Sequence, residues 1–136
     1  MTMTPSLPLR FATETDPDGA AVLHVHGEVD LATADELRER LLAEFARHPR
    51  LVVDLSHAML YDGAALRALH ALHREAIRQH RLPPALRGVR PLLAKALKVT
   101  GLNALFPLEP HVPFRRSVTR TALAREAVRA QLAQAA

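Results

Sequence analysis

Leu51-Val52-Val53-Asp54-Leu55 is the stretch that decides the fold class of this 136-residue chain. All of its residues except Asp54 are apolar, and the two valines are β-branched, which is typical of a strand buried on both faces. Such strands usually lie in the middle of a parallel sheet. The run therefore predicts an α/β domain, with Asp54 either inside the strand or at an end near solvent.

The residues before this strand predict a hairpin and a helix. Residues 7–15 and 21–26 have the pattern of two strands, and Asp16-Pro17-Asp18-Gly19 between them is a strong β-turn signal. The capping box Thr33-Ala34-Asp35-Glu36 predicts the start of a helix, because the threonine hydroxyl can accept a hydrogen bond from a free amide. This helix is expected to end at His48-Pro49.

Two further helices are expected after the strand. The first runs from about Gly63 to His80, with Asp62 as its cap. Pro91 suits the first position of the second helix, and Gly101 suits its end. The apolar face of the helix that begins at Gly63 is expected to consist of Leu66, Leu69, Leu72, Ala76 and Ile77.

The fourth strand should lie within residues 81–88. Pro83-Pro84 removes two amide donors there, which shortens the strand or moves it to an edge of the sheet. Residues 117–133 are helical by composition. We therefore expect an α/β domain with a mixed, mostly parallel β-sheet flanked by helices over residues 1–110, followed by a helical extension over residues 111–136.

Composition disfavours several classes of function. The chain has no cysteine, which excludes disulfides, thiol nucleophiles and cysteine-ligated zinc and is compatible with a reducing cytoplasm. No apolar run approaches the roughly 18 residues of a membrane span, and the first residues lack a signal-peptide pattern. The net charge is +4, but the arginines are scattered among acids without interleaved aromatics. We expect a cytoplasmic protein without a nucleic-acid partner.

Catalytic and metal-binding patterns are weak. Ser56, His57 and Asp54 are close in sequence, but nothing around them resembles a nucleophile elbow. Five glycines do not form a phosphate-binding loop. The histidines lack well-spaced carboxylates, so we expect no metal, no cofactor and no enzymatic activity; they include His24, His26, His70, His73 and His80.

Four stretches, taken in order, resemble the STAS domain of bacterial anti-sigma factor antagonists. They are Gly27-Glu28-Val29-Asp30-Leu31-Ala32-Thr33-Ala34, Leu51-Val52-Val53-Asp54-Leu55-Ser56, Tyr61-Asp62-Gly63-Ala64-Ala65-Leu66-Arg67-Ala68-Leu69 and Thr100-Gly101-Leu102. The resemblance covers about Leu9 to Pro107. It implies a STAS-like fold and a regulator that binds an anti-sigma factor, which is also a serine kinase. In that family, phosphorylation of a serine after the loop aspartate releases the partner, because phosphate adds negative charge inside the contact surface.

This chain departs from the family at the modifiable position. Gly63 stands where the family has its serine, and the next two residues offer no hydroxyl either. Tyr61 and Ser56 are nearby hydroxyls, but packing and local hydrogen bonds explain them better. The resemblance therefore implies a partner surface without its usual switch, formed by Asp30, Thr33, Tyr61, Asp62, Gly63, Ala64 and Ala65.

Two other functions stay open at this point. One is a homodimer or a scaffold subunit of a signalling or transport assembly, which would bury the Gly63 surface. The other is the binding of a small anion by free amides of the helix N-terminus at Gly63, against which the charge of Asp62 argues by repulsion.

Overall fold

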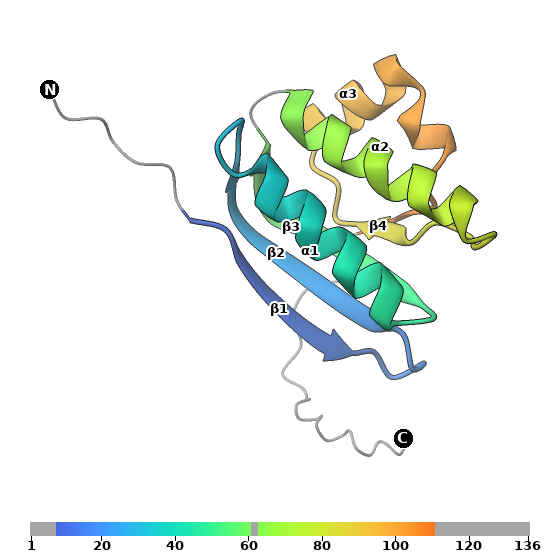
Figure 1. Ribbon diagram of the computed structural model, residues 1–136. Coiled ribbons are helices and arrows are strands. Elements are labelled where there is room, and N and C mark those ends of the chain that lie inside the picture. The colour runs from blue at the N-terminus through green and yellow to red at the C-terminus, as the bar shows by residue number, and fades with distance from the viewer. Residues whose placement is uncertain (1–7, 61–62, 111–136) are drawn as a thin grey trace, which may run out of the picture.

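The computed structural model describes residues 8–60 and 63–110 (Figure 1). The strands form a single sheet in the order β1-β2-β3-β4-β5, in which β1 is antiparallel to β2 and the other neighbours are parallel. The predicted mixed, mostly parallel α/β fold is confirmed. The elements are β1 (Arg10–Thr15), β2 (Ala21–Val29), α1 (Ala34–Arg47), β3 (Leu51–Leu60), α2 (Gly63–Arg78), β4 (Ala85–Arg87), α3 (Pro91–Thr100), the 3-10 turn η1 (Leu102–Ala104) and β5 (Leu108–Glu109).

Helices α1, α2 and α3 cover one face of this sheet (Figure 1). This follows from the strand order, because each parallel step from β2 to β5 moves in the same direction and such crossovers are right-handed. None of the helices in the described parts of the chain combines the length and apolar character that crossing a bilayer requires. The opposite face of the sheet carries no helix from residues 8–60 and 63–110.

The core lies between the sheet and the helices. Leu23 and Val25 of β2 and Val53 of β3 are fully buried there, as strand alternation requires. The predicted apolar face of α2 is buried at Leu69, Leu72 and Ala76, whereas Leu66 is half-buried and Ile77 is exposed. The buried helical side chains include Leu37, Leu41, Phe45, Leu69, Leu72, Ala76, Leu93 and Leu97.

One local expectation is wrong, and the structure decides between the alternatives in two others. Thr33 occupies the N-cap position of α1, but its side chain makes no capping hydrogen bond, so the predicted capping box is wrong. Pro83-Pro84 shortens β4 to three residues, yet β4 is not an edge strand, because β5 pairs with it. Asp54 lies inside β3 and is buried rather than at a solvent-facing strand end. The C-terminal helix expected over 117–133 lies outside the described residues.

Arg81 ties the end of α1 to the segment after α2. Its guanidinium lies over the Phe45 ring at 3.7 Å and donates hydrogen bonds to the carbonyl oxygens of Phe45 and His48. These carbonyls belong to the last turn of α1, where helix geometry leaves them without intrahelical donors.

We expect Arg81→Ala to lower the free energy of unfolding by about 2 kcal/mol, because it removes two charge-assisted hydrogen bonds and a cation–π contact. Urea denaturation followed by circular dichroism measures this. Arg78→Ala is the control, since its ion pair with Glu75 lies on the surface of α2, where solvent screening leaves such a pair with little effect on stability. Equal losses in the two variants would contradict the role of Arg81.

Candidate functional site

The carboxyl ends of the parallel strands bring the predicted site together. The register pairs Gly27 with Ala58 and Val29 with Leu60, so β2 and β3 end side by side. The loop 30–33 follows β2, and α2 begins shortly after β3. Asp30, Thr33 and Gly63 therefore lie along one edge of the sheet, which is where α/β folds commonly place their binding sites. Tyr61 and Asp62 lie outside the described residues.

Hydrogen bonds from its own side chains fix the loop between β2 and α1. One carboxylate oxygen of Asp30 accepts from the backbone amides of Ala32 at 2.9 Å and Thr33 at 3.1 Å. The Thr33 hydroxyl donates to the carbonyl oxygen of Glu28 at 2.8 Å and accepts from the amide of Asp30 at 3.0 Å. The Asp30 carboxylate therefore fixes the amides of this loop. The loop presents Leu31 to solvent, with 74% of that residue exposed.

The first turn of α2 combines an exposed glycine with buried alanines. Gly63 is exposed, whereas Ala64 and Ala65 pack into the core. A β-carbon built on Gly63 would meet only a guanidinium nitrogen of Arg67, at 3.9 Å. The glycine is therefore not required by crowding. Because Gly63 has no side chain, a partner can closely approach the backbone at the start of α2.

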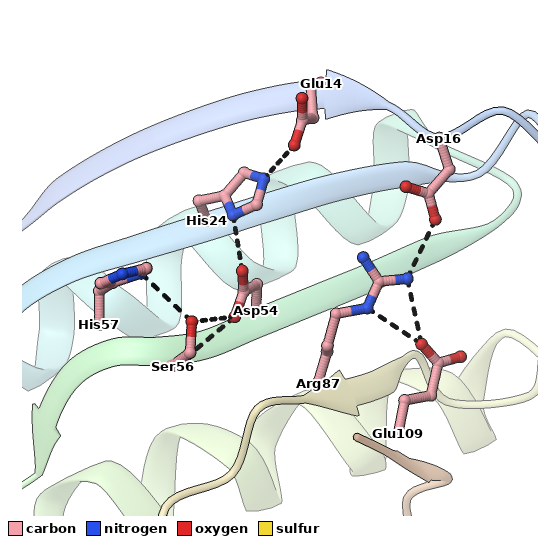
Figure 2. A network of polar contacts seen from close by, with 8 residues as sticks. All are labelled: Glu14, Asp16, His24, Asp54, Ser56, His57, Arg87 and Glu109. Carbon is pink, nitrogen blue, oxygen red and sulfur yellow. Dashed lines mark hydrogen bonds and ion pairs between the residues drawn. The ribbon is translucent and has the colours of Figure 1, made fainter. Parts of the chain in front are cut away.

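A second polar cluster lies on the sheet face opposite the helices (Figure 2). His24 of β2 is central, with Nδ1 2.8 Å from Asp54 Oδ2 and Nε2 2.5 Å from Glu14 Oε2. It thereby connects β1, β2 and β3. A neutral imidazole has a single N–H and can donate to one carboxylate, whereas an imidazolium donates to both. The geometry therefore favours protonated His24.

The electrostatics agree with this assignment. The hydrogen bonds to Asp54 and Glu14 raise the pKa of His24 from 6.5 to about 9, although burial acts in the opposite direction. Burial alone would raise the pKa of Asp54, but hydrogen bonds from His24 and Ser56 outweigh it and hold that pKa well below its usual range. The hydrogen bond from His24 likewise lowers the pKa of Glu14.

Arg87 extends the cluster across the sheet. Its guanidinium on β4 lies 3.0 Å from a carboxylate oxygen of Asp16 in the β1–β2 turn and 3.1 Å from one of Glu109 on β5. Figure 2 shows both contacts. Together with His24, this arginine connects all five strands on the face opposite α1, α2 and α3. Sequence reasoning missed this cluster.

Ser56 and His57 do not form a catalytic arrangement. The Ser56 hydroxyl donates to Asp54 Oδ1 at 2.8 Å and lies 3.2 Å from Nδ1 of His57, whose ring stacks on His26. A hydrolase relay requires the serine to donate to the histidine and the histidine to the carboxylate. Here the serine donates directly to a carboxylate of lowered pKa, which is a poor base, so Ser56 is not activated as a nucleophile. Within 8–60 and 63–110, no group of three acids or histidines is arranged to hold a metal ion.

Comparison with known proteins settles the family. The family described as "Mlab, STAS domain" matches residues 12–109. The chain belongs to the STAS domain family. An anti-sigma factor antagonist from Mycobacterium paratuberculosis is 26% identical, with 87% of this chain and 93% of that one covered and a TM-score of 0.59. Among curated proteins, no sequence matches.

Two more distant solved structures share the fold of this STAS domain. A variant of RsbS from Moorella thermoacetica is 23% identical, with 85% of this chain and 98% of that one covered and a TM-score of 0.53. An anti-sigma-factor antagonist (STAS) domain protein from Planctomyces limnophilus is 16% identical, with 86% and 97% covered and a TM-score of 0.55. The family that four short stretches predicted is thus confirmed.

The pKa of His24 makes the stability of this STAS domain pH-dependent. Because folding raises this pKa from 6.5 to about 9, the contribution is fully present below pH 6.5 and is lost as pH rises through 9. We expect the free energy of unfolding to fall by roughly 2 kcal/mol between these limits. Denaturation at a series of pH values measures the slope. His24→Gln should remove it, and an unchanged slope in that variant would assign the effect to another group.

Proposed function

We propose that this STAS domain is a non-enzymatic, protein-binding regulator of the anti-sigma factor antagonist type. Family membership and the 26% identity to the Mycobacterium paratuberculosis antagonist support this. The observation that carries it is the first turn of α2, where exposed Gly63 lies beside the loop held by Asp30 and Thr33. The partner is a protein resembling an anti-sigma factor or serine kinase. It contacts the surface that the resemblance implies, which combines the loop of Asp30 and Thr33 with the start of α2.

Binding in this proposal has no phosphate switch at α2. Gly63 carries no hydroxyl and so accepts no phosphate. The space around it would accommodate a serine, because a β-carbon there meets nothing closer than 3.9 Å. The glycine therefore changes regulation without reshaping the surface. A partner bound here stays bound, or is released by another mechanism.

The buried alanines refine the surface. Ala64 and Ala65 are 2% and 1% exposed, so they act through their small size and hardly at all through direct contact. In this proposal, Gly63 and the exposed residues near it at the edge of the sheet make the direct contacts with the partner. We further propose a cytoplasmic location and a division into a domain over 1–110 and a C-terminal extension over 111–136.

Affinity capture from the native host tests the proposal, with the full chain as bait. Wild type and Gly63→Ala should retain the same partner, because the added methyl group meets no close atom. Gly63→Glu should weaken retention at least about tenfold, since it places a bulky charge where the partner approaches. Gly63→Ser, incubated with the captured partner and ATP, should gain a phosphoryl group if that partner is kinase-like.

Two outcomes would count against this function. Equal retention by wild type and Gly63→Glu would mean that the partner binds elsewhere. A solution mass of twice the monomer, lost in Gly63→Glu and kept in Gly63→Ala, would favour the homodimeric or scaffold role, because the dimer would then occupy this surface.

A further inference from the structure

An apolar groove lies at the carboxyl end of β3, the strand that precedes Gly63 in the chain. It is a cavity of about 210 Å³ between the end of β3 and the start of α3. Buried Leu55, Ala58 and Leu93 form its floor, and Met59, Arg90 and Leu92 form its rim. We call these six residues the carboxyl-edge groove. Its volume suits one aliphatic side chain of the size of leucine or methionine.

The apolar rim is open to solvent. Leu92 is 72% exposed and Met59 is 39% exposed. Leu31, in the loop that follows β2, is exposed as well. Exposed large apolar side chains that gather around a concave site indicate an interaction surface, whereas single ones do not.

Two arginines lie near this part of the molecule, one at the rim of the groove and one in α2. Arg90 lies at the N-cap of α3 and contacts Met59 Sδ at 3.6 Å, and Arg67 lies one turn into α2, beside Gly63. Over the described ranges 8–60 and 63–110, neither guanidinium forms an ion pair. The groove is therefore apolar at its centre and carries the positive charge of Arg90 at its rim.

We propose that the carboxyl-edge groove receives an acidic segment of the partner protein, in which an aliphatic side chain is flanked by carboxylates. The aliphatic group enters between Met59 and Leu92, and the flanking carboxylates are attracted by Arg90 at the rim. This rests on the proposed function, because the groove lies at the carboxyl end of the strand that precedes Gly63. The chain's own C-terminal extension has the wrong charge for this site; its arginines are Arg115, Arg116, Arg120, Arg125 and Arg129.

Site-specific photocrosslinking in the native host tests the occupant. A benzophenone amino acid replaces Leu92 in one variant and Val99 in the other. Val99 is the matched control, since it lies on the same helix and is similarly exposed, at 79%. We expect a crosslink from position 92 and none from 99. Sequencing of the crosslinked peptide should show an aliphatic residue with at least two aspartates or glutamates nearby.

The remaining results of this experiment overturn the inference. They are a peptide from a second copy of this chain, a peptide from its own C-terminal extension, a peptide without acidic residues, or no crosslink from position 92. If Gly63→Glu still abolishes capture in such a case, the inference fails while the proposed function stands. If capture is insensitive to Gly63→Glu but the acidic crosslink forms, the groove is a site independent of that function.

A synthetic copy of the crosslinked peptide then measures the charge contribution. Arg90→Glu should weaken its binding at least about tenfold, and the loss should shrink at high salt. Lys98→Glu makes the same charge change at the far end of α3 and should alter the affinity less than about twofold. Equal effects would show that net charge, and not the groove, attracts the peptide.

Discussion

Gly27→Ala is expected to destabilise this STAS domain by about 4 kcal/mol or more, which is a large part of the roughly 5 to 15 kcal/mol that stabilises a typical domain. Gly27 lies in β2 with φ at +114°, a backbone conformation that disfavours any side chain. A β-carbon there would lie 2.3 Å from the carbonyl oxygen of Pro8. That oxygen belongs to backbone, so relief requires the strand or the segment before β1 to move. Urea denaturation and the circular dichroism spectrum measure the loss.

Gly101→Ala is the matched control for this substitution. Gly101 ends α3 with φ at +83°, but a β-carbon there meets no atom within 4 Å. Both alanine variants therefore carry the strain of a positive φ, and only Gly27→Ala adds a collision. We expect Gly101→Ala to lose about 1 kcal/mol. Similar losses at the two positions would mean that the Pro8 segment moves away at little cost.

The elements that sequence predicts well are those with a local cause. The apolar run from Leu51 to Leu55 marks a strand buried on both faces, and β3 lies at the centre of the sheet. Pro91 and Gly101 mark the ends of α3 because one lacks an amide hydrogen and the other adopts a left-handed conformation. Each signal depends on a few consecutive residues and needs no knowledge of the register.

The polar cluster has no such local cause. His24 and Asp54 are 30 residues apart, and they meet because the parallel register pairs them on adjacent strands. Alternation along β2 shows that His24 faces away from Leu23, but it cannot name the neighbour across the sheet. Thr33 illustrates the same limit, since its hydroxyl bonds to Glu28 in the preceding strand and leaves the helix uncapped.

The candidate surface is predictable only in part, for a similar reason. The resemblance located Gly63 and the loop after β2, because both fall within short sequence stretches. It also included Ala64 and Ala65, whose burial depends on how α2 packs. The groove beside Arg90 and Leu92 went unnoticed, because helical periodicity identifies the buried face of α3 and not what its exposed residues adjoin. The groove exists because β3 continues well beyond the short β4, and the lengths of two separate strands cannot be inferred from α3 alone.

Asp54→Ala is expected to lower the free energy of unfolding by about 3 kcal/mol. The carboxylate is 6% exposed and accepts hydrogen bonds from Nδ1 of His24 and from the amide and hydroxyl of Ser56. Its removal leaves these donors without their acceptor inside the sheet, and it takes one of two carboxylates from His24. Asp35→Ala is the control, because that side chain is 89% exposed and should contribute no more than about 1 kcal/mol.

A double-mutant cycle with His24→Gln separates this ion pair from the other contacts of Asp54. We expect a coupling free energy of roughly 1 to 2 kcal/mol between the two positions, and additive losses would contradict the proposed pairing. The cluster lies on the face opposite the helices (Figure 2), whereas the groove lies between the end of β3 and the start of α3. Under conditions where Asp54→Ala remains folded, its crosslinking from position 92 should therefore match that of the otherwise wild-type chain. A parallel loss of crosslinking would mean that β3, which carries both Asp54 and Met59, transmits the change from the polar face to the binding edge.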